Sequence, residues 1–387
     1  MSRLVVARHY RNGIDYELEF DPAQEQVLGC NLAATANRRH PDCWIAPALV
    51  DLQINGYGGV DFQGDDLREQ QLLGACAALR RDGCGLFFPT LITDLWPRML
   101  HRLAHLKGLR DKHAVLRNMM AGWHLEGPFL SDQPGFHGAH NPSLMLDPLP
   151  EHIQAIKSIT GDDRVILTVA PERPGVSDFI QAAIKEDFTV CLGHTNASRD
   201  QLDAAIKAGA ASFTHLGNAV PQQLHRHDNV LWRMLDSEGI AASLIPDGVH
   251  LPAMVFRSIW KMMGPERLFF TTDAMAAAGA PPGRYHIGGL EVEVGPDKVV
   301  RQPGGSNFAG SALEPSRGVE HAAVMLRIPW QEAWHAFSET PLRILNQRQR
   351  PSLKSCVNPM CCLIPFSESF EPSKIKTLLS HPVLGSV

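Results

Sequence analysis

The chain has 387 residues, enough for one large domain and one small one. Apolar residues make up 44% and charged residues 20%, as in an ordinary globular enzyme, and the net charge of −5 argues against a nucleic-acid-binding surface. No secretory-type apolar segment and no run long enough to cross a bilayer occurs, so we expect a cytoplasmic protein without nucleic-acid or membrane partners. Eight cysteines are scattered without a CxxC pair, which predicts reduced thiols.

Residues 1–47 are predicted to form short strands, for example 4–7 and 16–20. They are too few to bury a core alone, so this segment is expected to pair with strands from elsewhere. The apolar run 45–56 then predicts a buried strand that ends in a polar, glycine-rich loop.

Strands and helices alternate after this point. Helices are expected at 67–82, 96–109, 150–158, 177–186, 198–208 and 254–263, and strands at 85–89, 118–126, 165–170, 189–192, 211–214, 240–246 and 268–272. This alternation predicts a (β/α)8 TIM-like barrel over 48–346. A doubly wound open sheet is the alternative, but no GxGxxG follows the first strand. A hairpin is expected within 285–300, and helices at 316–326 and 330–340 close the domain.

Four polar residues each follow a different predicted strand: Glu126, His194, His215 and Asp273. Barrel enzymes carry their chemistry at the carboxyl ends of the strands, so we expect these side chains to meet. A glutamate with two histidines can bind a first-row divalent ion and leave positions open for water and substrate. Any one of them taken singly could equally be an ordinary hydrogen-bonded residue, so the prediction depends on the set.

Asp273 has two interpretations. A lone aspartate after a strand is often a helix N-cap. Beside a metal that acidifies water, the same carboxylate can take a proton and deliver it to a leaving amine. The second interpretation predicts hydrolysis of an amide or a related C–N bond.

Two loops add further polar residues. His137 and His140 follow Glu126, and either imidazole could polarise a carbonyl or hold an oxyanion. The segment 218–227 is locally basic, and Arg226 could bind a phosphate as a fork, although a solvated surface arginine is the simpler interpretation.

Taken together, these stretches resemble the N-acetylglucosamine-6-phosphate deacetylase family of the amidohydrolase superfamily. The matching motifs, in family order over roughly residues 44–346, are APALVDLQING from Ala46, HLEGPF from His124, GAHNP from Gly138, GHTNA from Gly193, THLGNA from Thr214, DGVH from Asp247, TDAMAAAG from Thr272 and AGSAL from Ala309. The resemblance implies a barrel with a small β-sandwich domain built from the chain termini.

The resemblance also implies roles for individual residues. Glu126, His194 and His215 look like the metal ligands, Asp273 like the general acid/base, and His140 like the group that polarises the acetyl carbonyl. Substrate contacts are implied for His140, Asn218, Ala219, His250 and Gly310. Arg226 looks like a phosphate ligand that reaches into the neighbouring subunit of a homodimer.

Two departures from the family pattern carry predictions. Gln53 and Asn55 stand where many amidohydrolases carry the His-x-His pair of a second metal, so one divalent ion is expected per subunit, zinc by default, with iron, cobalt or manganese as alternatives. The tail 347–387 is unlike the family, and we expect either fewer C-terminal strands in the small domain or a disordered tail.

His124 shares a strand face with Glu126 one layer deeper, so a supporting role is expected for it.

The predicted reaction is metal-dependent hydrolysis of N-acetylglucosamine 6-phosphate to glucosamine 6-phosphate and acetate. The alternatives are a related N-acyl amino-sugar phosphate deacetylase, another amidohydrolase such as a cyclic amidase or a deaminase, and a metal-free scaffold. The Gln53–Asn55 segment counts against the two-metal enzymes among them.

Overall fold

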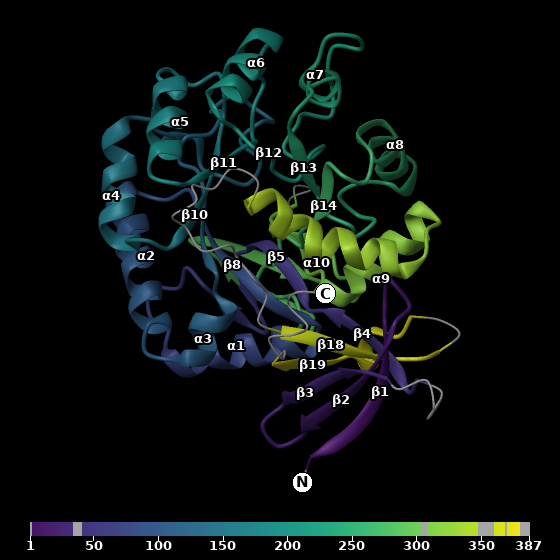
Figure 1. Ribbon diagram of the computed structural model, residues 1–387. Helices are drawn as coiled ribbons and strands as arrows, with labels where there is room; N and C mark the ends of the chain where they lie inside the picture. The colour runs from purple at the N-terminus through teal and green to yellow at the C-terminus, as the bar shows by residue number, and fades with distance from the viewer. Residues whose placement is uncertain (1, 34–40, 304–307, 347–359, 368–369, 380–387) are drawn as a thin grey trace.

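The computed structural model describes residues 2–33, 41–303, 308–346, 360–367 and 370–379. A large α/β barrel carries a smaller β barrel at one side, and the smaller barrel contains strands from both ends of the chain (Figure 1). No helix among the described residues is long and apolar enough to span a membrane.

Eight parallel strands of the large barrel stand side by side in chain order. They are β5 (Leu49–Ile54), β8 (Cys84–Ile92), β9 (Gly122–Glu126), β10 (Arg164–Val169), β11 (Thr189–Leu192), β12 (Ser212–Phe213), β13 (Ala241–Leu244) and β14 (Leu268–Phe270). A parallel bridge between Ile54 and Ala274 joins the first strand to the segment after the last. The expected (β/α)8 barrel is therefore confirmed, and the open sheet, in which the strand order would reverse, is excluded.

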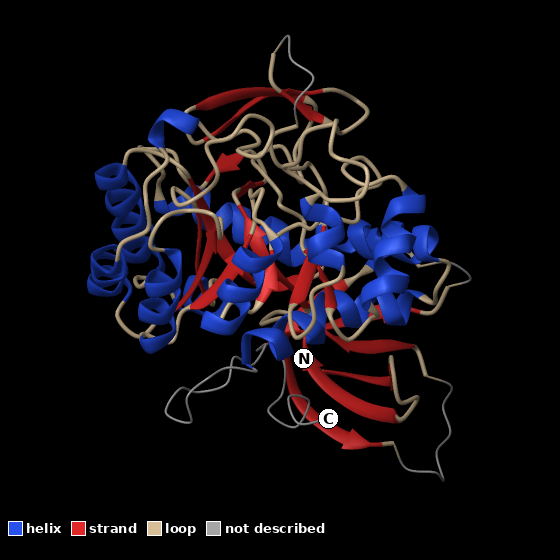
Figure 2. Ribbon diagram, turned by 90° about the horizontal axis from the view of Figure 1, so that it is seen from above, coloured by secondary structure: helices blue, strands red, loops and turns tan. Residues whose placement is uncertain are grey.

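Helices surround this barrel (Figure 2). They are α1 (Glu69–Arg81), α2 (Trp96–Arg110), α3 (Ala114–Met119), α4 (Pro150–Thr160), α5 (Val176–Lys185), α6 (Arg199–Ala208), α7 (Val230–Leu235), α8 (Ala253–Met263), α9 (Pro315–Leu326) and α10 (Trp330–Asn346). In α5 the apolar residues recur at helical spacing and are buried, so that face packs on the sheet. Ser198 caps α6 by accepting a hydrogen bond from the Gln201 amide, as its position before the helix predicts.

Two local boundaries differ from the sequence-based prediction. Residues 118–121 precede the strand, since α3 runs to Met119 and β9 begins at Gly122. Helix α10 continues through Pro341 to Asn346 instead of ending near 340. Its last turn buries Ile344 and Leu345 in the same cluster as Leu52, which stabilises the helix beyond the proline.

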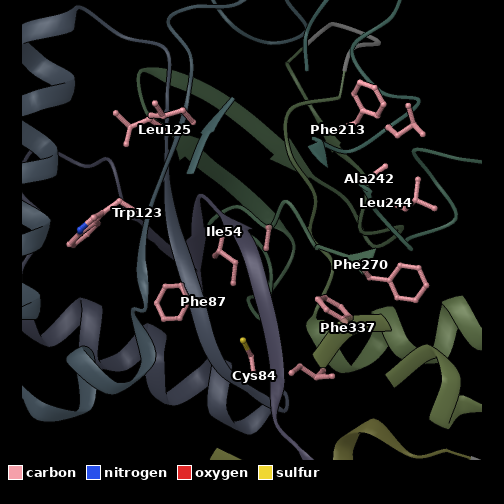
Figure 3. Close-up of a cluster of buried hydrophobic side chains, with 14 of the residues drawn as sticks. Ile54, Cys84, Phe87, Trp123, Leu125, Phe213, Ala242, Leu244, Phe270 and Phe337 are labelled. Carbon is pink, nitrogen blue, oxygen red and sulfur yellow. The ribbon is translucent and has the colours of Figure 1, made fainter. Parts of the chain in front are cut away.

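Alternation along β9 positions the site. Trp123 and Leu125 belong to the main hydrophobic core, whose members include Phe87 and Phe270 (Figure 3). Burying each such side chain stabilises the fold by about 1.5–3 kcal/mol. Because successive strand residues point to opposite faces, His124 and Glu126 face the inside of the barrel.

The small barrel corrects two expectations. Its strands are β1 (Arg3–His9), β2 (Asp15–Asp21), β3 (Gln26–Leu32), β19 (Lys376–Leu379), β18 (Met360–Pro365) and β4 (Cys43–Pro47), in that order around a closed barrel. A closed barrel replaces the expected sandwich, because closure leaves no unpaired sheet edge. A disordered tail is wrong for the described part of 347–387, since β18 pairs with β4 along five residues. The remaining tail residues lie outside the described residues.

The proposed domain division at 47/48 falls between β4 and β5, and the one at 346/347 falls at the end of α10. The short β6 (Gly56–Tyr57) and β7 (Val60–Asp61) follow the first barrel strand. The hairpin expected within 285–300 is a three-stranded sheet of β15 (Gly283–Ile287), β16 (Leu290–Val294) and β17 (Val300–Arg301), which turns at Gly288. The Gly288 amide donates to Asp61 Oδ2 at 2.9 Å, so this turn is attached to β7.

Candidate active site

Three of the predicted site residues adopt the left-handed backbone conformation just beyond their strands. The φ angles are +50° at His194, +30° at His215 and +51° at Asp273. This conformation costs a non-glycine residue about 1–3 kcal/mol and is retained where the surrounding structure enforces it. All three side chains line the cavity at the mouth of the barrel. No described helix begins immediately after Asp273, so the N-cap interpretation of this residue is wrong.

Glu126 is the centre of the site. His215 Nε2 lies 2.8 Å and His194 Nε2 3.3 Å from its Oε1, while His140 Nε2 lies 3.7 Å from its Oε2. All four side chains are buried. Burial opposes ionisation of Glu126, but the three imidazoles outweigh it and hold the pKa of the carboxyl well below its usual range.

The backbone determines which nitrogen of His194 is free. Its Nδ1 lies 3.2 Å from the Phe136 carbonyl, which can only accept, so Nδ1 carries the proton of the neutral ring. Burial lowers the pKa of His194 to about 4, so the ring is neutral near pH 7. The lone pair of Nε2, which has no hydrogen-bond partner, then faces a carboxylate oxygen. Two acceptors facing each other are stabilised by a cation between them.

His140 has the opposite tautomer. The Thr93 amide donates to its Nδ1 at 3.3 Å, so the neutral ring carries its proton on Nε2. The Thr93 hydroxyl lies 2.8 Å from the same nitrogen. His140 therefore presents an N–H donor to the cavity, whereas His194 presents a lone pair.

Two groupings of possible metal ligands can be compared. Glu126, His140 and His194 form a compact group whose ligand atoms all lie within 4.8 Å of one another. The sequence instead predicts His215 as the third ligand. His215 has the closer contact with Glu126, and its Nδ1 is a second buried nitrogen without a partner. Burial opposes its charge, but the hydrogen bond to Glu126 raises the pKa of His215. We favour His215 because its ring lies closer to Glu126 than that of His140, at 2.8 Å against 3.7 Å.

Two amides hold Asp273 beside Glu126. Gln53 Nε2 donates at 3.0 Å to both Glu126 Oε1 and Asp273 Oδ1, and Asn55 Nδ2 donates to Asp273 Oδ1 at 2.8 Å. Burial and the negative charge of Glu126 raise the pKa of Asp273 to about 7. One oxygen of the carboxylate thus carries both amide contacts, and the group titrates in the range useful for a general base.

His124 has the supporting position expected from the sequence. Its Nδ1 donates to the Leu52 carbonyl at 2.9 Å, so its Nε2 accepts from the Thr168 hydroxyl at 2.8 Å. Thr168 in turn lies 2.8 Å from the Thr214 hydroxyl. Burial lowers the pKa of His124 to about 4, so a neutral polar chain lies beneath Glu126.

A cavity of about 610 Å³ opens above these groups. All predicted site residues except Arg226 line it: Glu126, His140, His194, His215, Asn218, Ala219, His250, Asp273 and Gly310. Asn218 donates to the His215 carbonyl, and His250 Nδ1 lies 2.6 Å from Asp247 Oδ2. His137 also lines the cavity, whereas Arg226 is exposed outside it.

Several functional residues were not assigned these roles from the sequence. Gln53 and Asn55 were noted only as replacements for histidines, yet they hold Asp273. Thr93 fixes the tautomer of His140 with no motif to indicate it. Ile92 and Ile287 line the cavity but look like ordinary strand residues in the sequence. Gln53, Asn55, Ile92 and Thr93 share one signal, since each lies near the carboxyl end of β5 or β8. Ile287 lies in the hairpin outside the barrel strands and has no such signal.

No family model matches the chain. Among curated proteins it is 30% identical over 307 residues to the N-acetylglucosamine-6-phosphate deacetylase of Haemophilus influenzae, covering 78% of this chain and 77% of the relative. It is 30% identical over 302 residues to the N-acetylgalactosamine-6-phosphate deacetylase of Escherichia coli O157:H7, covering 78% of each. A mutant N-acetyl-D-glucosamine-6-phosphate deacetylase of Mycobacterium smegmatis, solved with N-acetyl-D-glucosamine-6-phosphate, superposes with a TM-score of 0.80 at 26% identity over 98% of both chains. The motifs, the barrel and these relatives agree, and the chain belongs to the N-acetylglucosamine-6-phosphate deacetylase family of amidohydrolases.

Proposed function

We propose that the chain hydrolyses the acetamide of N-acetylglucosamine 6-phosphate, giving glucosamine 6-phosphate and acetate. The observation that carries this is the meeting of Glu126, two histidines with unpartnered nitrogens and Asp273 at one cavity. The relatives in the deacetylase family support the substrate class. We also propose the cytoplasm as the location of the reaction.

Glu126, His194 and His215 fit a single divalent ion. The two lone-pair acceptors that face each other at 3.3 Å need a cation, and nitrogen with carboxylate donors suits zinc, iron, cobalt or manganese. Zinc is our first choice. Gln53 and Asn55 present amide N–H groups to Asp273, where the histidines of a second ion would present lone pairs. A bound ion would polarise the acetamide carbonyl and acidify the attacking water.

The protein groups then act on protons. Asp273 takes a proton from the attacking water and returns it to the departing amine, so that the C–N bond breaks without releasing a free amide anion. His140 donates from Nε2 to the carbonyl oxygen as negative charge develops on it. Its tautomer is held for this purpose by the Thr93 amide.

We propose that Asn218, Ala219, His250 and Gly310 contact the sugar phosphate, because each lines the cavity beside the catalytic groups. Arg226 lies outside this cavity, so its phosphate contact requires a second subunit. The homodimer in which Arg226 reaches the neighbouring site is part of the same proposal.

Turnover by the purified, metal-loaded protein is the first test. We expect acetate release from N-acetylglucosamine 6-phosphate, with kcat reduced about 10²- to 10⁴-fold in Asp273→Asn because general acid/base catalysis is lost. The amide keeps the shape of the side chain, so the ion content should stay near one per subunit. Unreduced kcat in this variant would remove Asp273 from the mechanism.

The galactose epimer is a second candidate substrate, because a relative equally identical to this chain is an N-acetylgalactosamine-6-phosphate deacetylase. Comparing kcat/KM for the two sugar phosphates decides between them. Failure on both, with turnover of a cyclic amide or an aminopurine instead, would favour the other amidohydrolase activities.

Mixed subunits test the dimer. An Asp273→Asn subunit keeps its Arg226, and an Arg226→Ala subunit keeps its Asp273, so each is impaired when alone. If Arg226 crosses between subunits, mixing the two should restore activity in the hybrid dimer. Activity that stays at the sum of the separate proteins would contradict the crossing.

A further inference from the structure

One part of the cavity wall is apolar, and it belongs to a single hydrophobic cluster. Ile92, Ile287 and Ala309 line the cavity and are buried members of this cluster, and Ala139 packs against it. Most of the remaining cluster members come from the three-stranded sheet β15–β17 and from residues 275–277. The sheet therefore contributes an apolar surface to a cavity whose other walls carry the catalytic groups.

Ile92 lies immediately beside the reacting groups. It is in register with Glu126 on the adjacent parallel strand, so the two side chains point in the same direction. The next residue, Thr93, holds His140 through its amide and its hydroxyl. A group bonded to the carbonyl carbon that His140 polarises therefore lies near Ile92.

Ile287 faces the same space from the turn above. A Cβ at Gly288 would lie 3.7 Å from Ile92 Cδ1, so the tip of Ile92 lies against this turn. The turn itself is fixed by the hydrogen bond from the Gly288 amide to Asp61. Ile287 is only 4% exposed and Ile92 9% exposed. The two buried side chains therefore form an apolar part of the cavity wall whose position is restricted by the residues packed around it.

We infer that Ile92 and Ile287 form the pocket for the acyl methyl group and thereby set the length of the acyl chain that is removed. This inference rests on the proposed function. The methyl of the acetamide is the apolar end of the reacting group, and this wall is the apolar surface next to the residues that act on it. A longer acyl chain would collide with the two isoleucines.

A series of N-formyl, N-acetyl, N-propanoyl and N-butanoyl glucosamine 6-phosphates tests the inference. One methylene in an apolar pocket changes kcat/KM by about 10- to 200-fold. In Ile287→Ala the ratio of kcat/KM for the butanoyl over the acetyl substrate should rise at least about tenfold. Ile92→Val and Ile287→Val, which remove one methyl each, should shift the propanoyl-to-acetyl ratio in the same direction by a smaller factor.

Leu290→Ala is the matched control. Leu290 pairs with Ile287 across the same turn and packs against the same cluster but does not line the cavity. The acyl preference of the Leu290→Ala protein should equal that of the wild type. Unchanged acyl ratios in both Ile287 variants and in Ile92→Val, with wild-type turnover of the acetyl substrate, would overturn the inference and leave the proposed function intact. A wild-type protein without turnover of any N-acyl substrate would remove both.

Discussion

Hydrogen bonds that individual residues already make decide their roles at the site. The Phe136 carbonyl leaves a lone pair on His194 Nε2, and the Thr93 amide leaves a proton on His140 Nε2. Two histidines at similar distances from one carboxylate are therefore chemically distinct. In the proposed mechanism the lone pair of His194 binds the cation, and the N–H group of His140 donates to the developing oxyanion.

Metal content separates these two histidines. His194→Ala should lower the bound divalent ion well below one per subunit, because a ligand is lost. His140→Ala should retain the ion but reduce kcat about 10²- to 10³-fold, as when an oxyanion donor is removed. Elemental analysis after dialysis and steady-state kinetics measure the two effects. Ion loss in His140→Ala, with full occupancy in His215→Ala, would reverse the ligand assignment in favour of the compact group.

Asn55 carries a second residue-scale prediction. It donates to Asp273 Oδ1 at 2.8 Å, and its own Oδ1 is buried without a partner. Hydrogen bonds to charged groups contribute about 1.5–3 kcal/mol, so Asn55→Ala should lower kcat roughly tenfold to hundredfold with KM nearly unchanged. Asn196→Ala is the control, since Asn196 bonds Gln133 and does not line the cavity. Equal kcat values in both variants would contradict a positioning role for Asn55.

A buried carboxylate, in addition to the bridge between Ile54 and Ala274, links the first barrel strand to the segment after the last. Asp51 of β5 accepts hydrogen bonds from the hydroxyls of Thr271 and Thr272 at 2.5 Å each, and from the Thr272 amide. Asp51 is fully buried, and burial raises the pKa of its carboxyl to about 6 in spite of these contacts. Folding thus favours the protonated form of the Asp51 carboxyl, compared with the unfolded chain.

This buried carboxylate predicts a pH effect on stability. The folded-state pKa of Asp51 exceeds the unfolded value, so its contribution is complete below about pH 4 and is lost as pH rises through about 6. The free energy of unfolding of the wild type, relative to that of Asp51→Asn, should fall by about 2 kcal/mol between pH 4 and pH 7. Urea denaturation across this range measures it. Parallel stability curves for the two proteins would show that the carboxyl does not titrate as expected.

At the scale of the whole molecule, the two ends of the chain complete one small barrel. Strand β18 pairs with β4 and β19, and β19 also pairs with β3. The two C-terminal strands bury Met360, Cys362 and Leu378. The tail, whose sequence is unlike that of the family, therefore supplies β18 and β19, which close the small barrel between β3 and β4.

Removing these strands should destabilise the protein. A chain ending at 346 exposes the paired edges of β3 and β4 and loses apolar side chains worth about 1.5–3 kcal/mol each. We expect a lower melting temperature and larger species in size-exclusion chromatography. A chain ending at 379 keeps both strands and is the matched control. Equal melting temperatures for the two truncated chains would mean that closing the small barrel adds nothing to stability.

The (β/α)8 barrel and the polar residues at its strand ends could be predicted from local sequence patterns. Helical and strand periodicities are read within about ten residues, and parallel strands necessarily bring their carboxyl ends to one side. Glu126, His194, His215 and Asp273 could be named for this reason. The supporting role of His124 also followed, because alternation along a strand is local.

The pairing of these groups depends on contacts between segments far apart in the sequence. Gln53 and Asp273 are 220 positions apart, and His140 depends on an amide 47 positions away. The closure of the small barrel by β18 and β19, and the membership of Ile287 and Ile92 in one hydrophobic cluster, also join distant segments. No local periodicity encodes such contacts, because they arise when separate elements pack together. The residues proposed to react were named from the sequence, and the packed barrel determines which proton, lone pair or apolar surface each one presents.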